Sequence, residues 1–179
     1  GKIKRTNTKY FMKNGKLIIL SASSGAGKST ICKDLLKKNE DWKFSISATT
    51  RPIREKEVDG KDYHFYSKEK FEHKEKFGEF IECEWVHGNR YGTLIEPIEK
   101  TIEKGEILLL DIDVKGAMNL IEEFDDDIIS IFIEPPGINV QEQQESLNDR
   151  LTSRGDYSET LIKQRLKRFE LELSYKEKF

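Results

Sequence analysis

Apolar runs alternate with amphipathic segments along most of this chain. Residues 16–21 form a short apolar run that leads into a glycine-rich turn, and Ile31, Leu35 and Leu36 then recur on one helical face up to Asn39. An uninterrupted apolar run of this kind is typical of a parallel strand that is buried on both faces. The pattern therefore predicts a strand, a glycine-rich turn and a helix as the first unit of an α/β fold.

Two more apolar runs extend the pattern. Residues 106–113 are followed by apolar positions at helical spacing up to Phe124, and residues 128–133 form a third run that stops before a Pro-Pro pair. The stretch 45–92 is polar and rich in aromatic residues, and its Asp59-Gly60 turn favours short antiparallel strands. From residue 158 onward an amphipathic helix is predicted, and its apolar face consists of Ile162, Leu166, Phe169 and Leu173.

The composition narrows the possible classes of protein. The chain has 179 residues, which fits one domain, and its ten Phe and six Tyr argue against disorder despite 36% charged residues. Lys and Arg number 31 against 33 Asp and Glu, so there is no basic excess that would favour nucleic acid or an anionic membrane. Its two cysteines cannot form a disulfide framework, and a reducing, cytoplasmic location is predicted.

The strongest local signal is the segment from Ala22 to Thr30, which follows the first predicted strand. It matches the phosphate-loop pattern except that Ala22 replaces the first glycine. Backbone N–H groups of such a loop and the following helix N-terminus attract phosphate oxygens. A chance glycine-rich turn is the alternative, but the flanking strand and helix favour the functional interpretation. The predicted ATP phosphate ligands are Ser24, Gly25, Ala26, Gly27, Lys28, Ser29 and Thr30, with Lys28 on the transferring phosphate and the Ser29 hydroxyl on Mg²⁺.

Asp111 and Asp113 stand at the end of the second long apolar run. In phosphate-loop enzymes an acid at the end of a neighbouring strand helps to hold Mg²⁺. The spacing predicts both carboxylates on one face of a strand, so that Asp111 serves the metal while Asp113 orients an arginine or a substrate. A solvated acid at a strand end is the alternative.

Two groups of arginines are candidates for phosphate binding. Arg51 and Arg54 flank Pro52, and two guanidinium groups at this spacing can bind one phosphate. A second group surrounds a Gly155 turn near the predicted last helix. A solvated surface is the alternative for both groups, of which the second comprises Arg150, Arg154, Arg165 and Arg168.

With these pieces in place, the chain resembles the guanylate kinase family from about residue 16 to residue 175. The motifs that carry the resemblance occur in the family's order and spacing, and their combination is far more specific than the phosphate loop alone. They are the segments Ser47-Ala48-Thr49-Thr50-Arg51, Gly60-Lys61-Asp62-Tyr63, Glu79-Phe80-Ile81-Glu82, Tyr91-Gly92-Thr93, and Leu110-Asp111-Ile112-Asp113 with Gly116.

The resemblance implies a role for each matching residue. Glu82 would accept hydrogen bonds from the two adjacent donors of guanine, while Ser47, Thr93 and Asp113 complete the GMP site. The GMP phosphate would be held by Arg51, Arg54, Tyr63 and Tyr91. The resemblance makes Lys28, Arg150, Arg154 and Arg165 catalytic, because their charges would stabilise the migrating phosphoryl group, and it assigns Ser29 and Asp111 to the metal.

The family also implies an organisation of the chain. A phosphate-loop core with a parallel sheet would comprise residues 16–46, 94–139 and 166–179, a mixed α/β GMP-binding insertion residues 47–93, and a helical lid residues 140–165. Residues 139–145 look like an insertion relative to the family, and Arg168 has no obvious counterpart in it. The family continues past position 179 with a strand and a helix.

The predicted activity is therefore ATP-dependent phosphorylation of GMP to GDP by direct in-line transfer, with Mg²⁺ as cofactor and with neither nucleic acid nor a membrane as partner. One alternative is a guanylate-kinase-like interaction module without activity, which typically lacks the phosphate-loop lysine that Lys28 provides here. Another is a kinase of a different phosphorylated small molecule, which Glu82 together with Ser47 disfavours.

Overall fold

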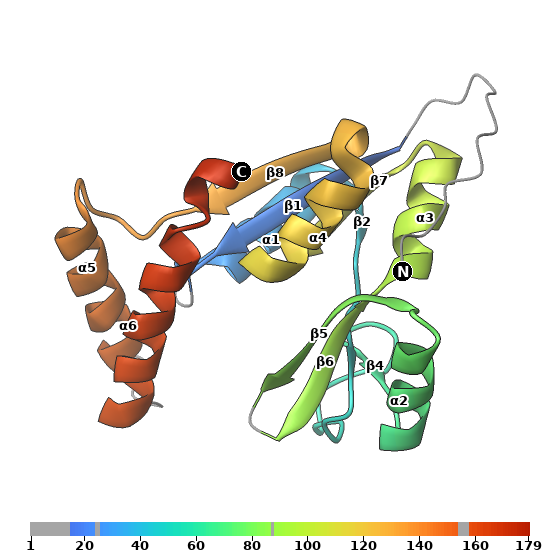
Figure 1. Ribbon diagram of the computed structural model, residues 1–179, viewed down its shortest axis with the longest axis horizontal. Helices are drawn as coiled ribbons and strands as arrows, with labels where there is room; N and C mark the ends of the chain where they lie inside the picture. The colour runs from blue at the N-terminus through green and yellow to red at the C-terminus, as the bar shows by residue number, and fades with distance from the viewer. Residues whose placement is uncertain (1–14, 24–25, 87, 154–157) are drawn as a thin grey trace.

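A computed structural model describes residues 15–23, 26–86, 88–153 and 158–179 of the chain. Its elements form a sheet with helices on both faces, a second sheet beside it, and a pair of helices that projects from the end of the first sheet (Figure 1). The strands are β1 Lys16–Ala22, β2 Lys43–Phe44, β3 Ala48–Thr49, β4 His64–Phe65, β5 Phe80–Val86, β6 Asn89–Leu94, β7 Ile107–Asp111 and β8 Ile128–Ile133. The helices are α1 Lys28–Lys38, α2 Lys68–Lys76, α3 Ile95–Lys104, α4 Val114–Phe124, α5 Val140–Ser153 and α6 Glu159–Leu173, with short 3₁₀ turns at Asp125–Asp127 and Lys176–Lys178.

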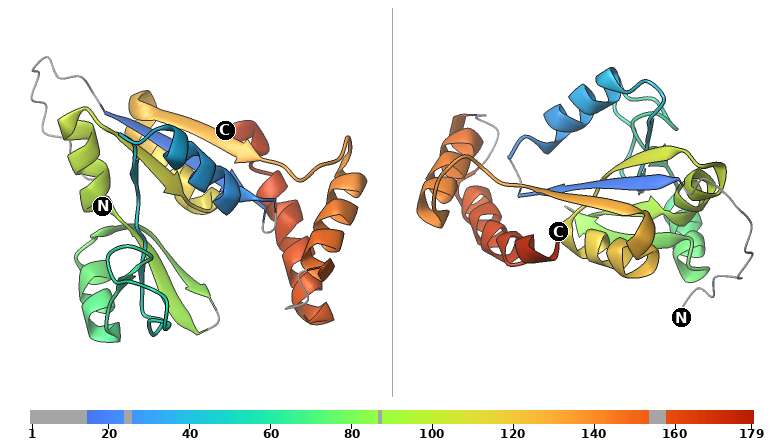
Figure 2. Two further views of the ribbon diagram at one scale, coloured as in Figure 1. Left: turned by 180° about the vertical axis from the view of Figure 1, so that it is seen from behind. Right: turned by 90° about the horizontal axis from the view of Figure 1, so that it is seen from above.

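The first sheet is parallel and has the strand order β2-β7-β1-β8. Alternate residues of β1 point to opposite faces, so Leu17 and Ile19 pack with α4 while Ile18 and Leu20 pack with Cys32 of α1. The two helices lie on opposite faces of this sheet (Figure 2). Burial on both faces explains why β1 and β7 are continuous apolar runs, as the sequence predicted, whereas Ile129 and Ile131 of the edge strand β8 are exposed.

Helix α1 begins directly after the phosphate loop. Gly27 adopts φ 102° at the helix N-cap, a left-handed conformation that favours glycine over residues with a Cβ. The buried face of α1 differs from the prediction: Cys32 is buried, whereas Ile31 is 37% exposed. Leu35 and Leu36 do pack against the sheet, and the shift arises because the helix contacts the sheet through the stripe that contains Cys32.

The second sheet has the order β4-β3-β6-β5 and belongs to the stretch predicted as a mixed insertion. β5 and β6 pair antiparallel, but β3 and β4, which flank the Asp59-Gly60 turn, pair parallel. The predicted antiparallel pairing across that turn is therefore wrong, because the connection is long enough to cross over. Helix α2 packs on this sheet through the stacked rings of Phe71 and Phe80.

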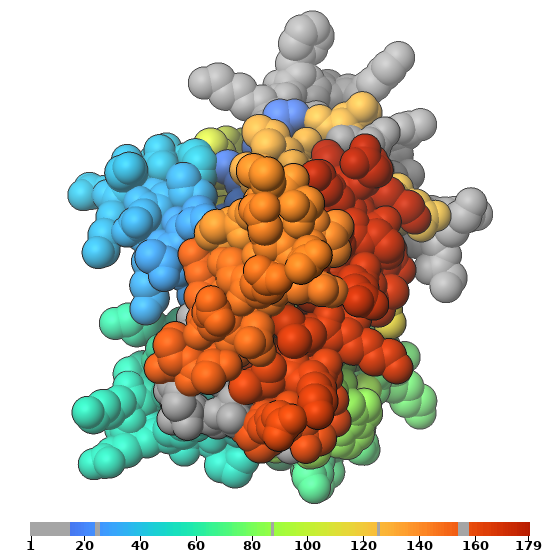
Figure 3. Space-filling model, turned by 90° about the vertical axis from the view of Figure 1, so that its left-hand side faces the viewer, coloured from blue at the N-terminus to red at the C-terminus, as the bar shows by residue number. Residues whose placement is uncertain are grey.

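Helices α5 and α6 pack on each other through a small core of their own. Leu147 and Leu151 of α5 are fully buried against Phe169 of α6. Figure 3 views this face, where α5 (orange) and α6 (red) lie side by side. The predicted apolar face of α6 is confirmed, since Ile162, Leu166 and Leu173 pack on the same cluster.

One boundary of the predicted division into core, insertion and lid falls inside a helix. Helix α6 continues without a break through the predicted boundary between residues 165 and 166. The division itself stays a prediction. Among the described residues, none of the helices has the length and apolar character that crossing a membrane requires.

Candidate active site

Two cavities adjoin where β1 and β7 end. The first, of about 550 Å³, is lined by the phosphate loop, the start of α1 and one face of α6. The second, of about 390 Å³, is lined by residues of the second sheet and by the segment that follows β7. Lys28, Val86, Asp113 and Arg168 line both cavities. A ligand in one cavity would therefore lie next to a ligand in the other.

The phosphate loop brings Lys28 to the junction of the cavities. Its ammonium group lies 2.6 Å from Oδ1 of Asp111 and 3.4 Å from the carbonyl oxygen of Ile112. Within the loop, the N–H of Ala26 donates to the carbonyl of Ser23 at 3.0 Å. Ser24 and Gly25, two of the predicted ATP ligands, lie outside the described residues.

Ser29 and Asp111 are the predicted metal ligands. Ser29 is exposed in the first turn of α1 next to Thr30, and Asp111 is the last residue of β7. A hydroxyl and a carboxylate are the oxygen donors that Mg²⁺ prefers, and in phosphate sites one or two protein ligands suffice because phosphate and water supply the others. The donor set therefore fits Mg²⁺.

The second cavity gathers most residues that were predicted for GMP. Ser47, Tyr63, Tyr91, Glu82, Thr93 and Asp113 all line it. The Thr93 hydroxyl donates to Oε1 of Glu82 at 2.6 Å, and burial raises the pKa of the Glu82 carboxyl. The Glu82 carboxylate is thus held in one orientation at the wall of the cavity.

The two arginines predicted for the GMP phosphate have different surroundings. Both amino groups of Arg51 donate to the carboxylate of Glu57, at 2.9 and 2.7 Å, and its guanidinium also lies 5.5 Å from the ring centre of Tyr63. Arg54 is exposed and does not line either cavity. Arg51 is thus held by a carboxylate, whereas Arg54 is bound to Glu57 through its backbone, with its N–H donating to the carboxylate and its carbonyl accepting from the N–H of Glu57.

Asp113 does not share a strand face with Asp111, contrary to the prediction. β7 ends at Asp111, and Asp113 precedes α4, where its Oδ1 accepts from the N–H of Gly116 at 2.8 Å. The chain turns into the helix at this point, so the alternation of a strand no longer applies. Asp111 pairs with Lys28 and Asp113 with Arg168, although both aspartates line the second cavity.

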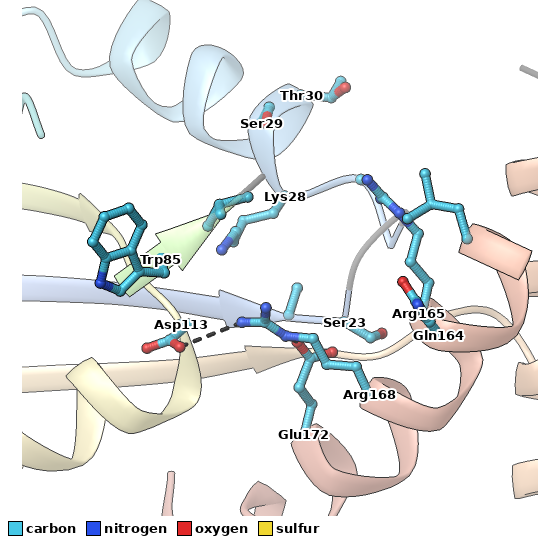
Figure 4. Close-up of a pocket in the computed structure, with 14 residues that line it drawn as sticks. Ser23, Lys28, Ser29, Thr30, Trp85, Asp113, Gln164, Arg165, Arg168 and Glu172 are labelled. Carbon is cyan, nitrogen blue, oxygen red and sulfur yellow. Dashed lines mark hydrogen bonds and ion pairs between the residues drawn. The ribbon is translucent and has the colours of Figure 1, made fainter. Parts of the chain in front are cut away.

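The predicted catalytic arginines come from the α5–α6 pair. Nη1 of Arg150 donates to the carbonyl of Ala26 in the phosphate loop at 3.3 Å, and Arg165 lines the first cavity. Figure 4 shows Arg165 extending toward the start of α1. Arg154 lies outside the described residues.

Several residues of the site were not predicted. Glu84 lies two residues after Glu82 in β5, and strand alternation could have indicated that both carboxylates face the same side. A hydrogen bond with Asp113 and burial together raise the pKa of Glu84 to about 8. Burial alone would raise the pKa of Asp113, but the hydrogen bonds that it accepts from Glu84 and from the N–H of Gly116 lower it. Trp85 and Glu172 line the first cavity, and no sequence signal singled out Glu172.

The two cysteines carry no chemistry here. Burial raises the pKa of Cys32 to about 11 and that of Cys83 to about 12. Both thiols are therefore protonated near neutral pH and are poor nucleophiles.

A parallel sheet with a phosphate-loop lysine after its first strand, and a second cavity beside that lysine, defines a phosphate-loop kinase of the α/β class. The comparisons with known proteins agree. The family profile described as guanylate kinase matches residues 14–179. The guanylate kinase of Chlorobium luteolum is 47% identical over 92% of this chain and 81% of its own length, and that of Clostridium tetani is 41% identical over 94% and 77%.

A solved structure gives the same result. The crystal structure of guanylate kinase from Anaplasma phagocytophilum superposes with a TM-score of 0.67 at 33% identity, covering 94% of this chain and 75% of that chain. The chain belongs to the guanylate kinase family. It is a nucleoside monophosphate kinase that phosphorylates GMP, and the resemblance seen in the sequence is confirmed.

Proposed function

We propose that the first cavity binds ATP, that the second binds GMP, and that the phosphoryl group passes directly between them in line. The observation that carries this proposal is the position of Lys28, which lines both cavities and lies beside Asp111. A cation at this junction can neutralise charge on the phosphoryl group from the start to the end of its transfer.

On the donor side, the phosphate loop binds the ATP phosphates through its backbone N–H groups. Gly27 at the N-cap of α1 directs these groups and the positive end of the helix at the cavity. Ser29 and Asp111 would hold Mg²⁺, which when bound neutralises phosphate charge. The complete set of donor ligands is Ser24, Gly25, Ala26, Gly27, Lys28, Ser29 and Thr30.

On the acceptor side, the carboxylate of Glu82 accepts from guanine N1–H and N2–H₂. Adenine has no hydrogen at N1, so this carboxylate favours guanine. Ser47 and Thr93 bind the remaining polar edge of the base, and Asp113 completes the GMP site. The GMP phosphate is bound by Arg51, Arg54, Tyr63 and Tyr91.

Arg51 has to change partners when GMP binds. In the structure its guanidinium is paired with Glu57. A phosphate oxygen offers the same two-point geometry as a carboxylate. We propose that Arg51 turns from Glu57, or shares its donors with it, to bind the GMP phosphate.

Catalysis requires no side-chain nucleophile, because the attacking GMP phosphate oxygen is already anionic. Lys28, Arg150, Arg154 and Arg165 supply positive charge around the migrating group, and closure of α5 and α6 excludes water that would hydrolyse ATP. Arg150 supports this role, since it already contacts the phosphate loop. A cytoplasmic location suits these metabolites and stays a prediction.

A steady-state assay tests the proposal. ADP release is measured with GMP, AMP, dTMP or no acceptor, in the presence and absence of Mg²⁺. We expect turnover with GMP that depends on Mg²⁺, and little ADP without an acceptor. Lys28→Ala should lower kcat by a factor of roughly 10²–10³ while GMP still binds. Turnover above a tenth of that of the wild type in this variant would contradict the assignment of Lys28.

A further inference from the structure

Arg168 occupies the wall between the two cavities and has no role in the function proposed above. It lies on α6, three residues after Arg165, and lines both cavities. Figure 4 shows the two arginines diverging: Arg165 extends toward the start of α1, whereas Arg168 is directed at Asp113. These two arginines of the helix therefore serve different parts of the site.

The guanidinium of Arg168 contacts carboxylates from three separate elements. Its Nε donates to Oε1 of Glu172 on α6 at 2.9 Å. Its Nη2 lies 3.4 Å from Oδ2 of Asp113, which precedes α4, and 3.5 Å from Oε1 of Glu84 on β5. Because Nε and Nη2 belong to one rigid planar group, the bond to Glu172 fixes where Nη2 points.

Glu172 is the buried residue that holds the guanidinium of Arg168 in place. Its side chain is 6% exposed, compared with 46% for that of Arg168. A buried carboxylate needs a cation or hydrogen bonds to offset its desolvation, and Arg168 provides both at Oε1 of Glu172. Nε of Arg168 is thus held by the buried Glu172, and Nη2 reaches the acceptor cavity.

Three carboxyl groups lie close together in the acceptor cavity, and Arg168 can offset their negative charge. Oxygens of Glu82, Glu84 and Asp113 all lie within 4.8 Å of one another. Three ionised carboxylates at such distances would repel one another, so Glu84 keeps a proton that it donates to Asp113, and the ionised Asp113 is the group that needs a cation beside it. Gly116 holds Oδ1 of Asp113 through a 2.8 Å hydrogen bond, and Arg168 lies near Oδ2.

We infer that Arg168 is a positioning residue of the GMP site: anchored on Glu172, it holds the carboxyl groups of Asp113 and Glu84 in the orientation that GMP requires and so ties α6 to the acceptor cavity. This inference rests on the proposed function. Arg168 acts through Asp113 and not on the transferring phosphoryl group, so its loss should affect GMP recognition and not the chemical step.

The test measures kcat and KM for both substrates in Arg168→Met and Arg168→Lys. A matched control is Lys167→Met, which removes an exposed cation of the same helix that lines neither cavity. Arg168→Met should raise the KM for GMP about fivefold, the effect of losing one partly exposed charged contact, while kcat and the KM for ATP change less than about twofold. Arg168→Lys should fall between the wild type and Met, because lysine keeps the charge but cannot bond Glu172 and Asp113 in one plane.

A double-mutant cycle with Asp113→Asn distinguishes a positioning role from a general effect on folding. It compares the effect of Arg168→Met on the KM for GMP with and without the Asp113 carboxylate. In the Asp113→Asn background, Arg168→Met should raise the KM for GMP by less than about twofold, since its target is already altered. Additive effects, an unchanged KM for GMP in Arg168→Met, or a fall in kcat with unchanged KM would each overturn the inference. If Arg168→Met lacks a cooperative thermal transition, Arg168→Lys carries the same comparison. Absence of GMP-dependent turnover in the wild type would instead contradict the proposed function.

Discussion

Glu82 illustrates how a single side chain can determine base choice. It is largely buried, its Oε1 accepts from Thr93, and burial raises the pKa of its carboxyl group. Leaving a buried acceptor without its donor costs more free energy than leaving an exposed one. A base that cannot donate to Glu82 therefore binds more weakly.

We therefore expect Glu82→Gln to reduce discrimination between GMP and AMP. The amide oxygen can still accept from guanine, but the amide NH₂ cannot, and the ratio of kcat/KM for the two nucleotides should fall about tenfold or more. Glu99→Gln, which changes an exposed carboxylate on α3, is the matched control. An unchanged ratio in Glu82→Gln would remove this residue from the guanine site.

Glu84 couples stability to pH. Its bond with Asp113 and its burial raise its pKa to about 8 in the folded protein, above the ordinary value of 4.5. Between these two values the folded state holds a proton that the unfolded state has released. The contribution of Glu84 to the free energy of unfolding is therefore fully present below pH 4.5 and is lost as the pH rises toward 8.

Glu84→Gln should accordingly flatten the pH dependence of stability. The amide does not titrate, so the variant should lose less stability than the wild type between about pH 5 and pH 8. Denaturant unfolding of both proteins across this range measures the difference. Parallel stability curves would show that Glu84 titrates near its ordinary pKa.

Helix α4 approaches the acceptor site so closely that only glycine fits at one of its positions. A Cβ on Gly116 would lie 2.6 Å from Cγ of Glu82 and 2.6 Å from Cδ1 of Ile112. The N–H of Gly116 also holds Asp113, so this one turn of α4 positions two predicted guanine ligands.

Gly116→Ala should consequently weaken GMP binding. Either Glu82 or the helix must move, at a cost of about 1–3 kcal/mol for overpacking. We expect a higher KM for GMP with little change in the KM for ATP, together with a loss of stability in denaturant unfolding. Lys115→Ala, an exposed position of the same helix, should change neither. A wild-type KM for GMP in Gly116→Ala would show that the site tolerates the displacement.

The contacts of helices α5 and α6 with the rest of the protein are compatible with closure of this helix pair over the site. Helices α5 and α6 share a small core of their own, formed around Leu147, Leu151 and Phe169. They meet the rest of the site through polar contacts, such as those of Arg150 with Ala26 and of Arg168 with Asp113. A unit joined in this way can move as a body without unpacking the main core.

Hydrogen exchange can detect this closure. Amides of residues 140–165 should be poorly protected without ligand and better protected with GMP and a non-hydrolysable ATP analogue, because the nucleotide phosphates then bridge the arginines and the phosphate loop. Amides of β1 and β7, which are buried on both faces, should be protected equally in both states and serve as the internal reference. Equal protection of residues 140–165 in both states would contradict a closing lid.

Several elements were predictable from local pattern alone. Strands β1, β7 and β8 are short uninterrupted apolar runs, and helix α6 repeats its apolar residues with the helical period. The phosphate loop and the motifs of the guanylate kinase family were likewise visible, because their chemistry requires particular residues at fixed spacing. These features identify the kind of reaction without reference to the tertiary structure.

Only the tertiary structure decided which charged groups meet. Arg168 and Glu84 lie 84 positions apart in the chain, and their meeting depends on how α6 packs relative to β5. The parallel pairing of β3 with β4 and the turn of Asp113 into α4 also depend on contacts beyond any local pattern. Periodicity reports which face of an element is buried, but it carries no information on which distant side chain lies opposite, and that determines the electrostatics of this site.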